Sequence, residues 1–226
     1  MPSTTRADDD ETSSAASHAR ARLERHRRLL TSTDPRERAT FWDAVALTAS
    51  SAEQARAFRA RLDRLHDARR LPLERERYVV VADPPGGRIG SGGATIRVAR
   101  ELESWFGEDW SSKRVFVLHT GGHSERSPQH GTCGKAFAEI PFDGTGRGIP
   151  GTILEAQLAQ LTPLAATLPP GVFVSCADVT LEFGNLGEVV SEDMYDAMRR
   201  GITALAHPSS VTIGEHHGVF ACDADE

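Results

Sequence analysis

The sequence is poor in several features that define common classes of protein. It has only three cysteines, widely separated and without a CxxC pair: Cys133, Cys176 and Cys222. This argues against a disulfide framework or a structural zinc site and favours a reducing compartment, which we expect to be the cytoplasm. No run of about 18 apolar residues occurs, so we expect no membrane span. The polar, acidic amino terminus has no apolar segment of the kind that a secretory signal needs.

Positive charge is also in short supply. The chain carries 26 Lys and Arg residues against 32 Asp and Glu, a net charge of -6. This balance predicts no basic face and no nucleic-acid partner, so an anionic ligand would need a local site. Lysine is scarcer still, because Lys113 and Lys135 are the only two. A lysine kept in an arginine-rich chain is a candidate for chemistry that needs a compact point charge, although chance explains one such residue equally well.

The chain divides into three expected segments. Residues 1–16 are dominated by Asp, Glu, Ser and Thr and are expected to form a disordered acidic tail. Residues 17–40 form a helical leader with a weak apolar stripe, which favours a solvated helix over a nucleic-acid-binding arm. Residues 41–226 contain the apolar patterns expected of one folded domain.

Apolar runs and amphipathic segments alternate along this domain. Strands are expected at 44–48, 78–82, 115–119 and 172–176, and helices at about 94–106, 152–168 and 192–206. A further helix is expected after Ser50 or Ser51, either of which begins a capping-box pattern, with Ala55, Phe58, Leu62 and Leu65 on its apolar stripe.

This alternation predicts the fold class. Strands that are apolar throughout and alternate with helices indicate an α/β protein with a Rossmann-like parallel sheet and helices on both faces. We expect 172–176 to be a central strand. In such sheets ligands bind at the carboxyl ends of the strands, and each glycine-rich or Asp-bearing turn of this sequence follows a strand there.

The first of these turns joins a strand to a helix. Glycines let backbone amides approach a phosphate, and the amino terminus of a helix adds a favourable dipole. The pattern is neither GxGxxG nor a P-loop, and a tight turn is the structural alternative. The neighbouring arginine and the strand–loop–helix context favour anion binding by Arg88, Gly90, Ser91, Gly92, Gly93 and Thr95.

A second glycine turn follows the strand at 115–119. Its candidate ligand-binding residues are Gly121, Gly122, Ser124 and Arg126, with Lys135 one loop further on. Arginine and lysine converging on glycine turns would neutralise the charge that develops on a leaving pyrophosphate. In the structural alternative Arg126 pairs with a neighbouring glutamate on the surface.

The third candidate is Asp178, just beyond the strand at 172–176. A carboxylate there is well placed to hold Mg2+ together with phosphates, whereas a turn or helix cap is the ordinary alternative. The histidines show no HExxH or similar spacing, so zinc is not expected.

Four segments together resemble one known family: DPPGGRIGSGGAT (83–95), HTGGHSERSPQHGTCGKAF (119–137), VSCADV (174–179) and HPSSVTIGEHHGVF (207–220). They are similar to the GDP-fucose pyrophosphorylases, which include fucose-1-phosphate guanylyltransferases and the amino-terminal part of bifunctional fucokinase/GDP-fucose pyrophosphorylases. The resemblance extends over about 41–222.

The resemblance implies a GT-A-like fold, Mg2+ dependence and transfer of GMP from GTP to fucose-1-phosphate with release of pyrophosphate. It places Gly90, Ser91, Gly92 and Gly93 around the base and phosphates. Arg126 and Lys135 would hold phosphates, and Asp178 would hold the metal.

The chain departs from the family in length. Family members continue into further acceptor-site sequence and a β-helix, and the bifunctional ones add a kinase. Two readings therefore stay open: a sugar-1-phosphate guanylyltransferase, or a non-catalytic nucleotide-binding remnant or half of a split enzyme whose carboxyl-terminal half is encoded separately.

Overall fold

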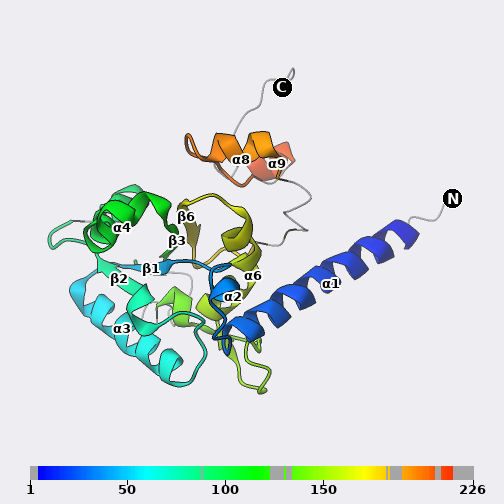
Figure 1. The fold of residues 1–226 in the computed structure, drawn as a ribbon, viewed down its shortest axis with the longest axis horizontal. Coiled ribbons are helices and arrows are strands. Elements are labelled where there is room, and N and C mark those ends of the chain that lie inside the picture. The colour runs from blue at the N-terminus through cyan, green and yellow to red at the C-terminus, as the bar shows by residue number, and fades with distance from the viewer. Residues whose placement is uncertain are drawn as a thin grey trace.

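The structure is a computed structural model that describes residues 5–87, 89–122, 130, 134–181, 183, 190–206 and 210–215. Its centre is a parallel four-stranded sheet in the order β2-β1-β3-β6 (Figure 1). The strands are β1 (Ala44–Ala49), β2 (Tyr78–Ala82), β3 (Arg114–His119) and β6 (Gly171–Cys176). Helices connect successive strands: α3 (Ala52–Asp67), α4 (Gly90–Phe106) and α6 (Ile153–Thr167). The expected Rossmann-like α/β class is confirmed.

The order of the strands creates a switch point in the sheet. From β1 the chain passes to β2 on one side, and from β2 it crosses to β3 on the other side of β1. In open α/β sheets the crevice for ligands lies outside the carboxyl ends of the strands at such a point. The fold therefore points to the ends of β1 and β3.

Alternate residues of β1 and β3 enter two separate cores because successive side chains of a strand point to opposite faces. On one face, Val45, Leu47, Phe116 and Leu118 join the apolar residues of α3 and α6. On the other face, Ala44, Ala46, Val115 and Val117 meet Val98 and Leu102 of α4. Helices thus cover both faces, with α4 opposite α3 and α6 (Figure 1).

Local signals of the sequence set the bounds of α3. Ser51 is its N-cap, and the Ser51 hydroxyl accepts a hydrogen bond from the Gln54 amide at 3.1 Å. The Gln54 side chain in turn accepts from the Ser50 amide at 2.7 Å. This is the second of the two expected capping patterns. The Gln54 side chain bonds to the amide of Ser50, one residue before the N-cap, instead of to the amide of the N-cap itself. The four expected stripe residues, Ala55, Phe58, Leu62 and Leu65, are all buried.

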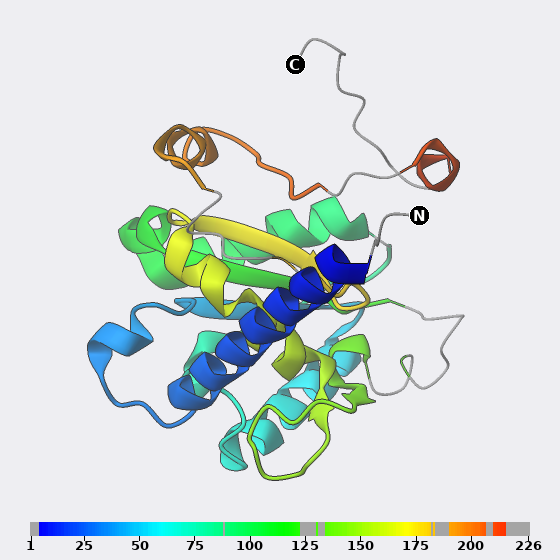
Figure 2. The same ribbon diagram turned by 90° about the vertical axis from the view of Figure 1, so that its right-hand side faces the viewer.

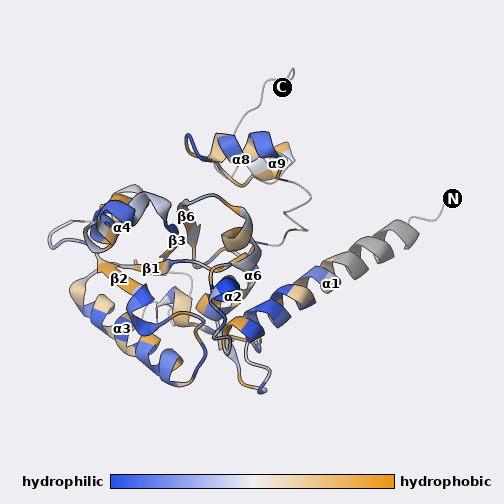
Figure 3. Cartoon of the chain, viewed as in Figure 1, coloured by the Kyte–Doolittle hydropathy of each residue, from blue (hydrophilic) through white to orange (hydrophobic). Residues whose placement is uncertain are grey.

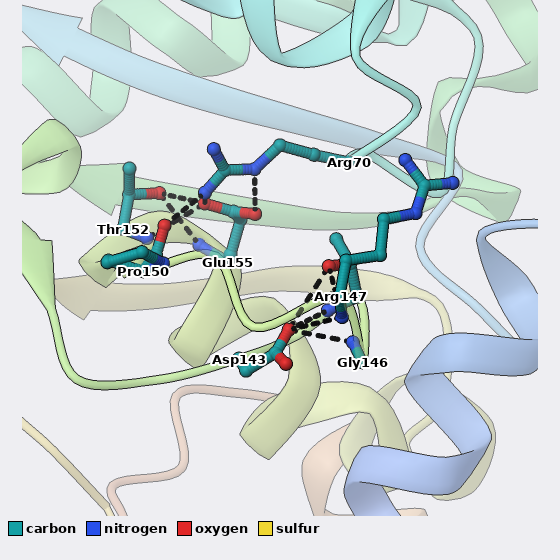
Figure 4. A network of polar contacts seen from close by, with 8 residues as sticks. Arg70, Asp143, Gly146, Arg147, Pro150, Thr152 and Glu155 are labelled. Atoms are coloured by element: carbon teal, nitrogen blue, oxygen red, sulfur yellow. Dashed lines mark hydrogen bonds and ion pairs between the residues drawn. The ribbon is translucent and has the colours of Figure 1, made fainter.

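The start of α6 is fixed by a buried polar network (Figure 4). Thr152 and Glu155 form a capping box, and Arg70 donates to both carboxylate oxygens of Glu155 at 2.7 Å. The loop before α6 is held by Asp143, whose carboxylate accepts from the amides of Gly146 and Gly148 at 2.7 Å. The amide of Gly148 and those of neighbouring residues lower the pKa of Asp143 to about 2.

Helix α1 (Thr5–Leu29) runs without a break into the segment expected to be a disordered tail. It packs against α6 (Figure 2) and buries Arg22, His26 and Leu29. Extending a helix is less costly than starting one, so an anchored carboxyl-terminal half supports helical backbone before it. The expected boundary between residues 16 and 17 falls within α1, and the division of the chain into segments stays a prediction.

The position of β6 differs from the sequence expectation. We expected 172–176 to be a central strand, but β6 pairs with β3 alone among the described strands and lies at the edge of the sheet. Its Val172 and Val174 are exposed. An apolar run does not distinguish an edge strand from a central one, because pairing partners come from distant parts of the chain.

The helix expected at 192–206 is also shorter than predicted. Helix α8 (Glu192–Met198) begins at its N-cap Ser191, and residues 202–206 have no regular structure. Ile202 and Leu205 are exposed, so no packed face extends the helix past Gly201. Helix α8 carries both hydrophilic and hydrophobic residues and lies apart from the sheet with α9 (Val211–Gly214) (Figure 3).

The remaining elements are short connections between these larger ones. They are α2 (Pro35–Arg38), η1 (Arg75–Arg77), η2 (Gly107–Ser112), η3 (Lys135–Phe137) and the antiparallel pair β4 (Glu139–Ile140) and β5 (Gly151–Thr152). Within the described ranges, every helix is too short or too polar to cross a membrane.

Candidate functional site

The candidate site lies at the carboxyl edge of the sheet, where the chain leaves β1, β3 and β6 and where α4 begins. The first turn of α4 contains Gly90, Ser91, Gly92 and Gly93, and Gly90 has a φ of +68°, which favours glycine. The N-cap residue Ile89 makes no side-chain capping hydrogen bond. Exposed amides at the start of a helix with no side-chain cap are suited to an anion.

In the turn after β3, glycine is required because two segments of backbone pass close to one another. A Cβ on Gly121 would lie 2.8 Å from the Ser50 nitrogen and 2.9 Å from the Ala49 carbonyl carbon. Glycine is therefore required where the end of β3 passes the end of β1. Gly122 has a φ of +105° and open space around its Cα.

Two candidates that are far apart in the sequence come into direct contact. Lys135 on η3 donates from Nζ to Oδ2 of Asp178 at 2.7 Å. The Lys135 side chain is 21% exposed and that of Asp178 is 55% exposed, so the pair is accessible. A cation and a carboxylate that face one another at the ligand edge can bind a phosphate and a divalent metal as neighbours.

The turn that carries Asp178 is held from two sides. The buried Gln157 of α6 donates from Nε2 to the carbonyls of Cys176 at 2.9 Å and Val179 at 2.8 Å. The Ala177 amide donates to the carbonyl of His119 at 3.0 Å. Because these bonds fix the backbone on both sides of Asp178, its carboxylate starts from a defined position.

Sequence reasoning missed a chain of hydrogen bonds that crosses the site. His119 lies between two threonines: Nδ1 is 3.4 Å from the Thr48 hydroxyl, and Nε2 is 2.9 Å from the Thr95 hydroxyl. Thr95 also donates to the Ser91 carbonyl at 3.0 Å. Burial lowers the pKa of His119, and the nearby Asp83 opposes that effect. The available signal was a histidine and a threonine ending two strands of otherwise apolar residues.

The same series of hydrogen bonds reaches η3, the element that carries Lys135, through Thr120. Its amide donates to the Thr48 hydroxyl at 3.3 Å, and its own hydroxyl accepts from the Ala136 amide at 2.9 Å. Thr48 and Thr120 are buried. The start of α4, the end of β3 and η3 are therefore joined by side-chain hydrogen bonds rather than by packing alone.

The site offers little support for a cysteine nucleophile or a protein-built metal cage. Burial raises the pKa of the Cys176 thiol, Asp178 raises it further and Lys135 opposes both. No group of three or more His, Cys, Asp or Glu residues suited to a metal occurs in the part of the chain that the structure describes. A metal held by Asp178 would therefore take most of its ligands from a substrate and from water.

Three expected site residues, Arg88, Ser124 and Arg126, lie outside the described residues. Of the others, the structure places Thr95 against Ser91 and Lys135 against Asp178. Gly121 and Gly122 follow β3 at the same edge of the sheet.

The fold and this edge define a Rossmann-like α/β protein with glycine turns at the switch point of a parallel sheet. A family model described as the fucose pyrophosphorylase domain matches residues 107–226. The chain belongs to this family.

Curated relatives agree with the match. The fucose-1-phosphate guanylyltransferases of Homo sapiens and Mus musculus are 38% and 40% identical to the chain over 186 residues, which is 82% of the chain. The bifunctional fucokinase/GDP-fucose pyrophosphorylase of Arabidopsis thaliana is 30% identical over 216 residues, covering 84% of the chain and 19% of that protein. The chain spans 29% and 30% of the length of the human and mouse relatives. No solved structure matches the chain.

Proposed function

We propose that the chain binds GTP and Mg2+ as the nucleotide site of a fucose-1-phosphate guanylyltransferase, which transfers GMP to fucose-1-phosphate. A phosphate oxygen of the sugar phosphate attacks the α-phosphorus of GTP, and the bond from that phosphorus to the bridging oxygen of pyrophosphate breaks. The observation that carries the proposal is the contact between Lys135 and Asp178 at the ligand edge of the sheet. The names of the human and mouse relatives support the choice of GTP and fucose-1-phosphate.

In this proposal the residues position the substrates and neutralise the charge of the phosphates, because the sugar phosphate is itself the nucleophile. The amides at the start of α4 donate hydrogen bonds to phosphate oxygens. Lys135 exchanges its contact with Asp178 for the phosphates and neutralises the charge of the leaving pyrophosphate. Asp178, released from the lysine, would hold Mg2+. A bound Mg2+ would supply further neutralisation of the triphosphate charge.

Asp178→Asn tests the metal role. The substitution keeps the shape of the side chain and removes its charge. In the wild type, Mg2+ and GTP should each strengthen the binding of the other by the same factor. In the variant that coupling should disappear, while binding of GTP without metal stays equal or tightens slightly. Calorimetric titration of GTP with and without Mg2+ measures both quantities.

The outcome of that titration separates the metal role from a structural one. Asp109→Asn is a matched control, since Asp109 is an exposed carboxylate on η2, before the amino end of β3. Equal enhancement by Mg2+ in the wild type and in Asp178→Asn would remove Asp178 from the metal site. A loss of stability in Asp178→Ala without a metal effect would indicate a capping residue instead.

The two lysines of the chain provide a second test. Lys135→Ala should weaken GTP binding by about 2 kcal/mol, the range of a hydrogen bond to a charged group. Lys113→Ala should leave GTP affinity unchanged, because Lys113 lies over the Phe106 ring at the opposite edge of the sheet. Lys135→Arg should rescue only in part, since a planar guanidinium does not replace a point charge. Equal GTP affinities in the two alanine variants would refute the assignment of Lys135.

The coverage of about three tenths of the human and mouse relatives supports a second candidate function. In that case the chain is a nucleotide-binding module, and turnover needs further polypeptide. Release of pyrophosphate from GTP, Mg2+ and fucose-1-phosphate by the chain alone would favour the transferase. Binding of GTP without release would favour the module.

A further inference from the structure

Histidine 119 occupies a central place at the candidate site, yet neither the family resemblance nor the proposed mechanism uses it. It is the last residue of β3 and stands between β1 and α4, the two elements whose ends form the expected phosphate site. Its two ring nitrogens face two threonine hydroxyls, one from each of these elements. The directions of these hydrogen bonds can be worked out from both ends.

At the α4 end, the Thr95 hydroxyl gives its proton to the Ser91 carbonyl. A hydroxyl has a single proton, so the Thr95 oxygen must accept from His119. Nε2 of His119 therefore carries a proton and donates it at 2.9 Å.

At the β1 end, the Thr48 oxygen already accepts the amide proton of Thr120 at 3.3 Å. Its own proton is free to point at Nδ1 of His119, 3.4 Å away. Nδ1 then accepts and carries no proton. The Thr95 end thus requires a proton on Nε2, and the Thr48 end fits the neutral form of that tautomer.

The target of this chain of hydrogen bonds is the Ser91 carbonyl, inside the first turn of α4. That turn contains Gly90, Gly92 and Gly93, which have no side chain with which to restrain it, and its N-cap makes no side-chain hydrogen bond. The hydrogen bond from Thr95 to Ser91 is a side-chain restraint on this turn, and His119 orients the Thr95 hydroxyl that makes it.

We infer that His119 is a positioning residue: as a neutral Nε2–H donor, it holds the Thr95 hydroxyl on the Ser91 carbonyl and fixes the first turn of α4 against the sheet edge. The functional meaning of this inference rests on the proposed nucleotide site, because it is there that a fixed first turn would align the amides with a phosphate.

Protonation of His119 would disturb its contact with Thr48 and leave the Nε2 donor to Thr95 in place. An imidazolium donates from both nitrogens, so Thr48 would have to turn its proton away from Nδ1 while still accepting from Thr120. The groups that face His119 give little compensation. Thr48 and Thr95 are neutral, Cys176 is its register neighbour on β6, and Asp83 beyond β2 is the carboxylate that acts on the ring. Burial lowers the pKa of His119 and so favours the neutral form, while the Nε2 proton that Thr95 needs is present in both forms.

Two substitutions at His119 test the contributions of its two ring nitrogens separately. His119→Gln places an amide near the position of Nε2, so it can still donate to Thr95, but it cannot be protonated. His119→Asn places its amide near the position of Nδ1 and does not reach Thr95. His66→Gln replaces a half-buried histidine of α3 as the matched control.

The first measurement needs no ligand. Nitrogen-15 spectra should show the His119 ring, identified by its loss in His119→Gln, as the neutral Nε2–H tautomer at pH 7. Amide hydrogen exchange at residues 90–95 should be faster in His119→Asn than in the wild type and near the wild-type rate in His119→Gln. The Nδ1–H tautomer, or equal exchange in all three proteins, would overturn the inference.

The second measurement uses GTP. His119→Asn should bind GTP about tenfold more weakly than the wild type, the effect of one lost hydrogen bond. His119→Gln should stay close to the wild type at pH 7.5. His66→Gln should match the wild type throughout. Identical affinities of His119→Asn and His119→Gln would contradict the positioning role.

The two proposals fail in different ways. A wild-type chain that binds no GTP, or that binds it without transferring GMP, would count against the proposed function. The tautomer and the exchange rates at the start of α4 would still confirm or refute the role of His119.

Discussion

Replacing Arg70 with alanine is expected to lower the free energy of unfolding by about 3–5 kcal/mol, the range found when one partner of a buried ion pair is removed. Glu155 is 1% exposed and receives two hydrogen bonds from Arg70. Without the arginine, its carboxylate stays buried at the start of α6, and Thr152 is its remaining partner within the described part of the chain. Urea unfolding at pH 7 measures the difference.

Arg75 provides a matched control for this experiment. It also pairs with two carboxylate groups, those of Asp63 and Asp67, but all three side chains are exposed. Surface pairs of this kind contribute about 0–1 kcal/mol, so Arg75→Ala should change stability little. Similar losses in Arg70→Ala and Arg75→Ala would mean that burial of the Glu155 partner does not matter.

A double substitution isolates the buried charge. Glu155→Gln keeps an acceptor for the Thr152 amide but removes the carboxylate. In that background, adding Arg70→Ala should lower stability by only about 1 kcal/mol, the ordinary value of a hydrogen bond. An undiminished loss would show that Arg70 acts through packing or through its bond to the Pro150 carbonyl instead.

Patterns of neighbouring residues predicted most of the sheet. The runs at 44–48, 78–82 and 115–119 became β1, β2 and β3 with bounds shifted by no more than one residue, because periodicity and flanking turn residues are local signals. The edge position of β6 depends on pairing between distant segments, which no local pattern contains. The shortened α8 has the same cause, since helical propensity without a face to pack does not sustain a helix.

The candidate site was likewise predictable from the sequence only in part. The placement of the glycine turns and Asp178 at one edge was predictable because each follows a strand, and parallel strands end at one edge. Lys135 was expected there only because it lies one loop after β3. The direct contact between Lys135 and Asp178 was not predictable, since 43 positions separate them. Thr48, His119 and Gln157 were missed because each looks like an ordinary residue of a strand or helix. Their roles arise from hydrogen bonds that only the folded chain brings together.

The second large effect is expected from His26, which lies in α1 with its side chain fully buried. Neither ring nitrogen has a hydrogen-bond partner among the residues that the structure describes. Burial, with a smaller contribution from the charge of Arg27, lowers the pKa of His26 to about 4. In the unfolded chain the ring is protonated near pH 6.5, whereas in the folded protein it resists protonation until a much lower pH.

The sign of the pH dependence follows from this difference. Above pH 6.5 the ring is neutral in both states and contributes nothing to the slope. Between pH 6.5 and 4 the unfolded state binds the proton and the folded state does not. The free energy of unfolding therefore decreases as the pH is lowered. The loss should reach roughly 3 kcal/mol at pH 4, since one unit of pKa corresponds to about 1.4 kcal/mol.

His26→Leu should remove this part of the acid sensitivity and also raise stability at pH 7 by about 1 kcal/mol, because two buried polar atoms without partners are replaced by an apolar side chain of similar size. Urea unfolding at a series of pH values from 7.5 to 4 measures both effects. Arg27→Gln should keep most of the wild-type slope, since burial is the larger cause of the lowered pKa. A His26→Leu variant that is less stable at pH 7 and keeps the full slope would show that the ring has partners in solution, and that the acid sensitivity of the fold arises elsewhere.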